Sequence, residues 1–282
     1  MSDSERTPIR KAVIPAAGLG TRLKPLTSIA PKEMLPLGKK PALQYIMEDL
    51  QASGINDIIF VVSPQKTRIR EYFGDSVFEG SVRLQYVIQD PQRGLADAIL
   101  QAEEAVNGEP FAVALGDSVI ISTEQKTPME RLLNAYRSNP ASAAITVERV
   151  PREDCVRYGM VKPAGEMVDH AFEIDDLIEK PRVEDAPSDY AIGGRYIFDS
   201  GIFDCIRRTP PGFGGEHQIT DSIRLMIADG KRVWCAPLLD GERRYDIGNF
   251  KTYSEAFTTI CLQDPELAPF VLRAVGAAGT NK

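Results

Sequence analysis

Histidine, cysteine and long apolar runs are scarce in this 282-residue chain, and each scarcity excludes a class of protein. The two histidines, His170 and His217, are too few for a histidine-rich metal centre. The four cysteines lie far apart and form no CxxC pair, so neither a zinc site nor a disulfide framework is indicated. We therefore expect buried free thiols in a cytoplasmic protein. No stretch is long and apolar enough to cross a membrane.

An excess of positive charge is also missing. The formal net charge of -7 argues against a nucleic-acid partner, although a local phosphate site remains possible. Residues 1–11 are polar and lack the apolar segment of a signal peptide. With 43% hydrophobic and 26% charged residues, the chain is expected to be globular, with a substantial core and no membrane partner.

Short apolar runs alternate with amphipathic segments in the first half of the chain. Strands are predicted at 11–15, 57–63, 84–89, 111–115 and 143–150, and helices at 41–50, 67–73, 94–106 and from 127 onward. This alternation predicts an α/β fold with a Rossmann-like, mostly parallel sheet and helices on both faces. The second half is richer in predicted strands, at 159–162, 172–179 and 190–198, and carries predicted helices at 219–228 and 249–262.

No Ser/Gly-rich linker divides the chain. We expect one large domain over residues 1–248 and a small helical C-terminal appendage over residues 249–282, whose last residues, 276–282, are expected to fray.

A glycine-rich turn, Ala16 to Arg22, directly follows the first predicted strand. Glycines let backbone N–H groups approach phosphate oxygens closely. Leu23 stands where the third glycine of a dinucleotide-binding motif would be, and no Gly-Lys-Ser/Thr follows, so neither a dinucleotide site nor a Walker A loop is indicated. Arg22, Lys24 and Lys32 share the loop, which suits a triphosphate, although a solvated basic loop would show the same pattern.

Three later segments carry possible site residues. Asp117 follows the fourth predicted strand, where a carboxylate can hold Mg²⁺ or simply cap a turn. Glu179 and Lys180 end another predicted strand, and alone they would be a surface pair of little energetic value. Asp246 lies in Arg244-Tyr-Asp-Ile-Gly-Asn249, which alone is only typical of a helix start.

Taken in this order, the segments resemble the sugar-1-phosphate nucleotidylyltransferase family. The resemblance rests on GLGTR (18–22), PK (31–32), GD (116–117), EKP (179–181) and YDIGN (245–249), and it runs from about Lys11 to about Tyr253. The strings at 31–37, 209–212 and 215–221 are similar to the uridylyltransferase branch, which implies UTP and glucose 1-phosphate as substrates. The segment 73–84 is shorter than is common in that branch, and the segment 89–94 is closer to the thymidylyltransferase pattern. Thymidylyl transfer, another sugar phosphate, or an inactive regulatory relative are the alternatives.

The resemblance also implies a role for each matched residue. The nucleotide would be contacted by Ala16, Ala17, Gly18, Gln89 and Gly94, with Gln89 reading the pyrimidine edge. The phosphates that leave as pyrophosphate would be held by Arg22 and Lys32. Magnesium would be bound by Asp117 and Asp246, and the sugar phosphate by Gly159, Glu179, Lys180 and the backbone near Ile192. Self-association into a homo-oligomer, a dimer or a tetramer, is implied as well.

Overall fold

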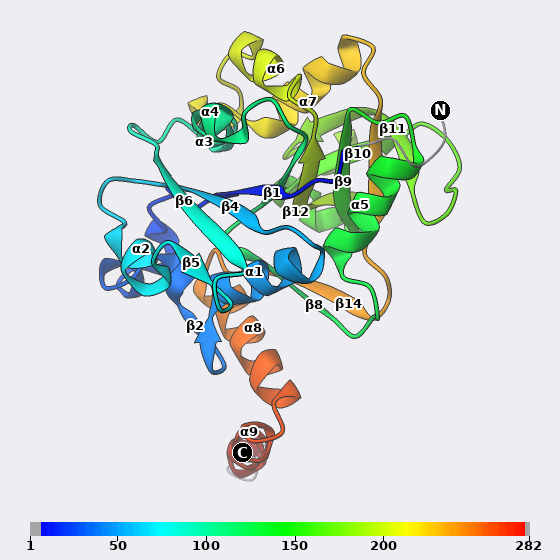
Figure 1. Ribbon diagram of the computed structural model, residues 1–282. Coiled ribbons are helices and arrows are strands. Elements are labelled where there is room, and N and C mark those ends of the chain that lie inside the picture. The colour runs from blue at the N-terminus through cyan, green and yellow to red at the C-terminus, as the bar shows by residue number, and fades with distance from the viewer. Residues whose placement is uncertain (1–6, 280–282) are drawn as a thin grey trace.

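One large sheet organises the protein (Figure 1). The computed structural model describes residues 7–279, and ten strands of that part form this sheet. Across the sheet the strands are β10 (Gly159–Pro163), β11 (Phe172–Glu179), β13 (Val233–Pro237), β9 (Ala143–Arg149), β12 (Tyr190–Phe198), β7 (Phe111–Ala114), β1 (Lys11–Pro15), β4 (Asp57–Val62), β6 (Val82–Ile88) and β5 (Ser76–Val77). Every strand predicted from the sequence is present, whereas β13 and the short β5 were not predicted.

The sheet is mixed, which corrects the expectation of a mostly parallel sheet. β7, β1, β4 and β6 run parallel to one another, and so do β9 and β13. The other neighbours, which involve β5, β10, β11 and β12, are antiparallel. Parallel strands need long crossovers, which the helices of the first half supply, whereas β10 and β11 are joined by a short loop. Strand–helix alternation therefore predicted strand direction only for the first part of the sheet.

Helices cover both faces of the sheet, as predicted. On one face lie α1 (Ala42–Ala52), α2 (Thr67–Phe73) and α5 (Pro128–Ser138), which pack with Ala12 and Ile14 of β1. On the other face lie α3 (Leu95–Gln101), α4 (Glu103–Val106), α6 (Ile202–Arg208) and α7 (Ile219–Ala228), which pack with Val13. Side chains of a strand point to alternate faces, so β1 contributes to both cores. The second layer stands at the top of Figure 1, and its helix α6 was not predicted.

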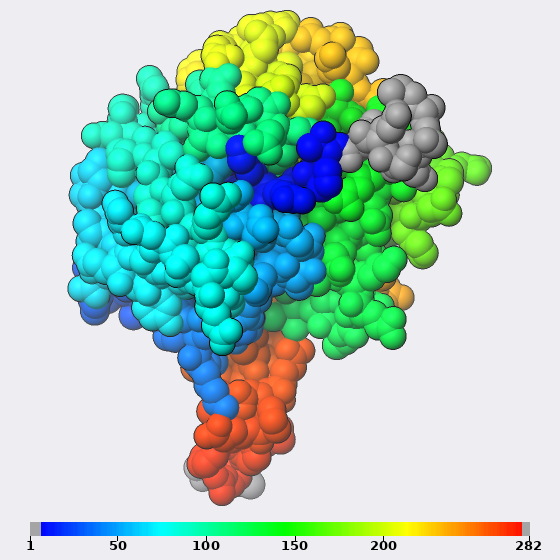
Figure 2. All heavy atoms as spheres, viewed as in Figure 1, coloured from blue at the N-terminus to red at the C-terminus, as the bar shows by residue number. Residues whose placement is uncertain are grey.

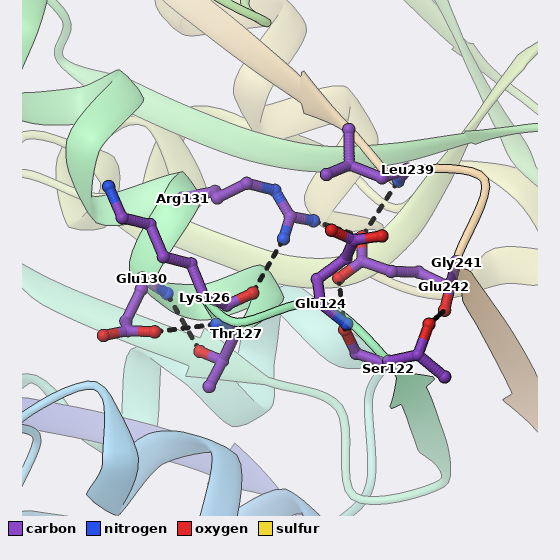
Figure 3. Close-up of polar contacts among 10 residues, drawn as sticks. Ser122, Glu124, Lys126, Thr127, Glu130, Arg131, Leu239, Gly241 and Glu242 are labelled. Carbon is purple, nitrogen blue, oxygen red and sulfur yellow. Dashed lines mark hydrogen bonds and ion pairs between the residues drawn. The ribbon is translucent and has the colours of Figure 1, made fainter.

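Two small antiparallel pairs lie outside the large sheet. β8 (Ser118–Ser122) follows β7 after a tight turn and pairs with β14 (Glu242–Asp246). β2 (Pro36–Leu37) pairs with β3 (Lys40–Pro41). Beyond β8, Thr127 and Glu130 each accept a hydrogen bond from the other's backbone N–H, which is the capping box predicted at the start of α5 (Figure 3). The β8–β14 pairing, which the sequence did not indicate, brings Asp246 opposite Ser118, the residue that follows Asp117.

The two last helices extend from the body as a narrow stalk (Figures 1 and 2). α8 (Phe250–Gln263), predicted from the sequence, starts at Asn249, whose side chain accepts a hydrogen bond from the Thr252 N–H. It contacts β14 and β2, and the β2–β3 hairpin runs beside it in Figure 2. α9 (Ala268–Gly279) was not predicted; it includes part of the tail expected to fray, and residues 280–282 lie outside the described chain.

All four cysteines are buried free thiols, as expected from the sequence. Among residues 7–279, no helix is both long enough and apolar enough to span a bilayer.

Candidate active site

The glycine-rich loop after β1 is shaped by hydrogen bonds from its neighbours. Ala16 is buried in the core, and its N–H donates to the Val61 carbonyl of β4 (2.8 Å). Gly20 adopts a left-handed conformation (φ 62°), which favours glycine, and it starts a 3-10 turn at Thr21–Leu23. The Thr27 hydroxyl donates to the Gly20 carbonyl (2.9 Å) and holds the turn closed. The loop thus leaves Ala17 and Gly18 at the rim of a cavity.

This cavity has a volume of about 500 Å³. It is bounded by loop residues 17–21 and by Gln89, Gly94, Lys32 and Asp117, together with Leu95, Ala98 and Glu216. The structure therefore brings together four of the five residues predicted to contact the nucleotide. Ala16, the fifth, lies beneath the loop in the core.

Lys32 forms an ion pair with Asp117 inside the cavity. Burial alone would lower the pKa of Lys32, but the carboxylates of Asp117 and Glu33 outweigh it and hold the pKa above its ordinary value. Burial would likewise raise the pKa of Asp117, but Lys32 brings it below the usual range. Both groups are therefore charged at neutral pH, and together they are close to electroneutral.

Asp246 reaches the same place through the β8–β14 pairing. Asp246 stands opposite Ser118 in the register, and the Ile247 N–H donates to the Asp117 carbonyl (3.0 Å). Burial, followed by repulsion from the Asp117 carboxylate, raises the pKa of Asp246. Two carboxylates that repel each other in a buried place offer the hard oxygen ligands that Mg²⁺ prefers. The residues present therefore fit a divalent cation.

Arg22 lies beside Asp246. A Cβ atom placed on Gly248 would stand 2.8 Å from an Asp246 carboxylate oxygen and 3.1 Å from the Arg22 guanidinium. A larger residue at this point would therefore displace the Asp246 carboxylate or the Arg22 guanidinium. The cation predicted for the leaving phosphates is thus next to the second predicted magnesium ligand.

The residues predicted to bind the sugar phosphate form a second group. Gly159 of β10 pairs with Glu179 of β11, and a Cβ on Gly159 would stand 2.8 Å from Ile192 and 3.1 Å from both Glu179 and Thr220. The Thr220 hydroxyl donates to the Glu179 carboxylate (2.7 Å). Glu179 is thereby fixed in orientation, and the site has no space for a side chain at position 159.

Lys180 extends from this group. Its backbone is left-handed (φ 47°), which is uncommon for a residue with a side chain, and its N–H donates to the Tyr158 carbonyl (3.0 Å). Its ammonium group lies 3.3 Å from a Glu179 oxygen and 4.9 Å from the centre of the Phe213 ring. Such a backbone is kept where the surroundings enforce it, often at functional sites.

Tyr196 and Arg244 are buried groups that interact electrostatically with residues of these two clusters. Burial raises the pKa of Tyr196, and the Glu179 and Asp117 carboxylates add to the effect, while Arg244 opposes it. Tyr196 is therefore within electrostatic reach of the Glu179 group and of Asp117 together. Arg244 is held by an ion pair with Glu148 and lies 4.8 Å from the centre of the Tyr158 ring.

Gln89 and Gly94 are already engaged within the protein. The Gln89 amide nitrogen donates to the Asp97 carboxylate (2.7 Å) and to the Gly94 carbonyl (3.1 Å). A Cβ on Gly94, whose φ is 121°, would stand 2.6 Å from the His217 carbonyl oxygen. Glycine is thus required at position 94 by the packing of the His217 backbone, before any base is bound.

These arrangements agree with a comparison to known protein families. The sequence profile of the family described as nucleotidyl transferase matches residues 11–263, which is most of the chain. The chain belongs to the nucleotidyl transferase family. It is similar to a UTP–glucose-1-phosphate uridylyltransferase of Streptococcus pyogenes, with 38% identity over 93% of this chain and 91% of the relative.

Solved structures show the same likeness. A UDP-glucose pyrophosphorylase complexed with UDP-glucose covers 91% of this chain and 100% of its own, with a TM-score of 0.84 and 33% identity. A UTP-bound enzyme of the same kind from Acinetobacter baumannii covers 95% of this chain and 99% of its own, with a TM-score of 0.85 and 30% identity.

Sequence reasoning missed several residues of this nucleotidyl transferase's site. Asp97 and Thr220 orient Gln89 and Glu179, and Glu33 and Lys66 form an ion pair beneath the loop. Glu33 directly follows Lys32, and that adjacency was the one available signal. The others lie on helices and in a loop without any motif, so only the fold could place them.

Proposed function

We propose that this nucleotidyl transferase joins UTP to glucose 1-phosphate, giving UDP-glucose and pyrophosphate. The observation that carries the proposal is that Lys32 and Asp117 share one cavity and that Asp246 lies next to Asp117. The named relatives are similar over nearly their whole length, which supports the same pair of substrates.

Each half of the site suits one substrate. Ala17 and Gly18 offer backbone N–H groups to the nucleotide, with Ala16 fixing the start of the loop. Arg22 and Lys32 supply positive charge for the β- and γ-phosphates. Lys180 would hold the sugar phosphate and the α-phosphate, while Gly159, Glu179 and Ile192 would contact the sugar.

Gln89 supports a uracil or thymine base. Its amide nitrogen has two hydrogens, and both are used by Asp97 and Gly94, so the amide can offer a ligand only its Oε1 acceptor. Uracil and thymine carry an N3–H donor that matches this acceptor. Cytosine presents an acceptor at N3 and would leave two acceptors facing each other, so CTP would be rejected.

Magnesium is the metal that we propose for Asp117 and Asp246. A bound divalent cation would neutralise charge on the triphosphate as the α-phosphorus is attacked. The protein's own cations align the two substrates, which are polyanions and repel each other. The sugar phosphate is already an anionic nucleophile at neutral pH, so in-line displacement of pyrophosphate needs no general base. The absence of a serine–histidine pair in the described site agrees with this route.

We extend the proposal to the organisation of the protein. Residues 1–248 would carry both substrate sites in one Rossmann-like domain, with residues 249–282 as a helical appendage. Phe270, Leu272 and Val275 of α9 are each more than 60% exposed, which supports self-association into a dimer or tetramer. Four buried thiols support a reducing, cytoplasmic setting.

Pyrophosphate release from purified protein tests the substrates. We would supply glucose 1-phosphate and Mg²⁺ with UTP, dTTP or CTP in parallel. Release with UTP alone is the expected result. Release with dTTP alone would make the protein a thymidylyltransferase, and no release with any of them would point to another sugar phosphate or to an inactive regulatory relative.

A further inference from the structure

A buried ion pair that the proposed chemistry does not use lies directly beneath the glycine-rich loop. Both carboxylate oxygens of Glu33 accept hydrogen bonds from the Lys66 ammonium group, at 2.9 and 3.1 Å. The two side chains are 1% and 10% exposed. A fully buried pair costs much to desolvate and adds little net stability, so its presence next to the cavity calls for another explanation.

Lys66 also holds the backbone of the loop. Its ammonium group donates to the Ala16 carbonyl oxygen at 2.6 Å. In a trans peptide the carbonyl and the following N–H point in opposite directions. Because the Ala16 carbonyl is drawn down to Lys66, the N–H of Ala17 is turned the other way, toward the side where Ala17 and Gly18 line the cavity.

Glu33 connects the same pair to the other phosphate-facing segments. It lies in the 3-10 turn Lys32–Met34, directly after the lysine that meets Asp117. It also packs on the turn before Asp117, since a Cβ on Gly116 would stand 3.0 Å from the Glu33 side chain. One ion pair therefore joins the loop after β1, the turn of Lys32 and the turn of Asp117.

Charge gives a second reason for the pair. Glu33 is part of the cavity wall, and a lone carboxylate there would repel a polyphosphate. Burial raises the pKa of Glu33, while Lys66 opposes this and favours the ionised form. Because Lys66 neutralises Glu33, Glu33 can join these segments without repelling the nucleotide phosphates.

We propose that Glu33 and Lys66 are a positioning pair: without touching either substrate, they preset the N–H groups of residues 17–18 and the Lys32 ammonium group for the nucleotide phosphates. This inference rests on the proposed binding of a nucleoside triphosphate in the cavity. It assigns to the pair an effect on the nucleotide and none on the sugar phosphate.

Lys66→Met tests the positioning role, because it removes the charge and the bond to Ala16 while keeping an unbranched side chain. We expect the KM for UTP to rise by about 10- to 100-fold, since a misplacement of about 1 Å can cost that much. The KM for glucose 1-phosphate should change by less than about twofold. Lys66→Arg, which keeps the charge and a donor, should recover part of the loss.

The double variant Glu33→Met/Lys66→Met separates positioning from stability. Removing both charges avoids the large cost of an unpaired buried ion, so the urea midpoint should recover relative to Lys66→Met. The KM for UTP should remain high, because the Ala16 carbonyl is still unheld. A double variant with normal KM for UTP would show that the pair acts only through folding, and the proposal would fail.

The Arg131–Glu242 pair supplies a matched control (Figure 3). The Arg131 and Glu242 side chains are 16% and 0% exposed, close to the exposed fractions of Lys66 and Glu33. Glu242 is the first residue of β14 and Asp246 is the last, so the pair lies at the far end of that strand from Asp246. Arg131→Met should lower the urea midpoint and leave the KM for UTP unchanged. If it raises the KM for UTP as much as Lys66→Met does, the effect is general and the positioning role is wrong.

Hydrogen exchange in the absence of substrates keeps the inference separate from the proposed function. We expect amides in residues 16–22 to exchange faster in Lys66→Met and at the wild-type rate in Arg131→Met. Equal protection of that segment in Lys66→Met and wild type would overturn the positioning role, whichever nucleotide the protein uses. Failure of wild-type protein to release pyrophosphate from UTP would instead overturn the proposed substrates.

Discussion

Gly18→Ala should separate nucleotide binding from folding more sharply than any other single change in the loop. Gly18 is exposed, and an added Cβ would have the Lys32 ammonium nitrogen as its nearest neighbour, at 3.9 Å. That is ordinary van der Waals contact, so the methyl group fits the unliganded protein. Its φ is outside the left-handed region, so alanine brings no backbone strain there.

The magnitude follows from the space that the methyl group takes. A phosphate oxygen bound to Lys32 should lie about 2.8 Å from the ammonium nitrogen. An oxygen placed between the two groups would then be about 1.1 Å from the new Cβ, which is the difference between 3.9 Å and about 2.8 Å. The phosphate must therefore move by more than about 1 Å, and a shift of that size costs about 100-fold.

The assay is steady-state pyrophosphate release together with thermal unfolding. We expect kcat/KM for UTP to fall by about 100-fold. Stability should stay the same or rise by about 0.4–1 kcal/mol, because alanine restricts the unfolded chain. Gly165→Ala is the matched control, since Gly165 is exposed and a Cβ there would meet nothing within 4 Å. Normal kcat/KM for UTP in Gly18→Ala would refute the placement of the phosphates between the loop and Lys32.

Three further changes probe other parts of the structure. Lys180→Ala should lower kcat by about 100-fold or more while calorimetry still detects UTP binding, and near-normal turnover would exclude its role on the transferred phosphates. The apparent affinity for Mg²⁺ should weaken as the pH falls through the raised pKa of Asp246, because protonation removes the charge of that ligand. The Asp246→Asn variant should bind Mg²⁺ weakly at every pH. If its Mg²⁺ affinity has the same pH profile as that of the wild type, Asp246 is not a ligand. Asp49→Ala should cost about 3–5 kcal/mol in urea unfolding by leaving Arg195 buried and unpaired, and a loss under about 1 kcal/mol would contradict that reasoning.

Local patterns predicted the first part of the fold well. The apolar runs of β1, β4 and β7 and the helix faces between them are set by residues close together in sequence, so periodicity was enough. The direction of β12 was not predictable in this way, because it lies between β7 and β9 and runs antiparallel to both. Its place depends on which long-range pairing buries the most surface, and no local signal reports that.

The candidate site likewise has a part that local sequence predicts and a part that depends on long-range contacts. The glycine-rich loop and Lys32 are close together in sequence, so their composition and spacing were enough to predict a phosphate-binding site. Asp246 looks like a helix start when read alone, and only the family resemblance placed it beside Asp117, 129 positions away, through a five-residue ribbon. Lys66 had no motif at all, since a lysine that points inward to a carboxylate and a carbonyl looks like any surface lysine in the sequence.

The pairing of Lys32 with Asp117 explains how one site can hold so many charges before its substrates arrive. The proposed roles place Lys32 on phosphate oxygens and Asp117 on a divalent cation, yet here each neutralises the other. Binding of the metal–nucleotide complex would replace one ion pair by two, since the cation takes the carboxylate and the phosphate takes the ammonium group. Neither Lys32 nor Asp117 is then left unpaired before or after binding, which keeps the desolvation cost low. Because the exchange needs both ligands, metal and nucleotide binding should be coupled, each strengthening the other by the same factor.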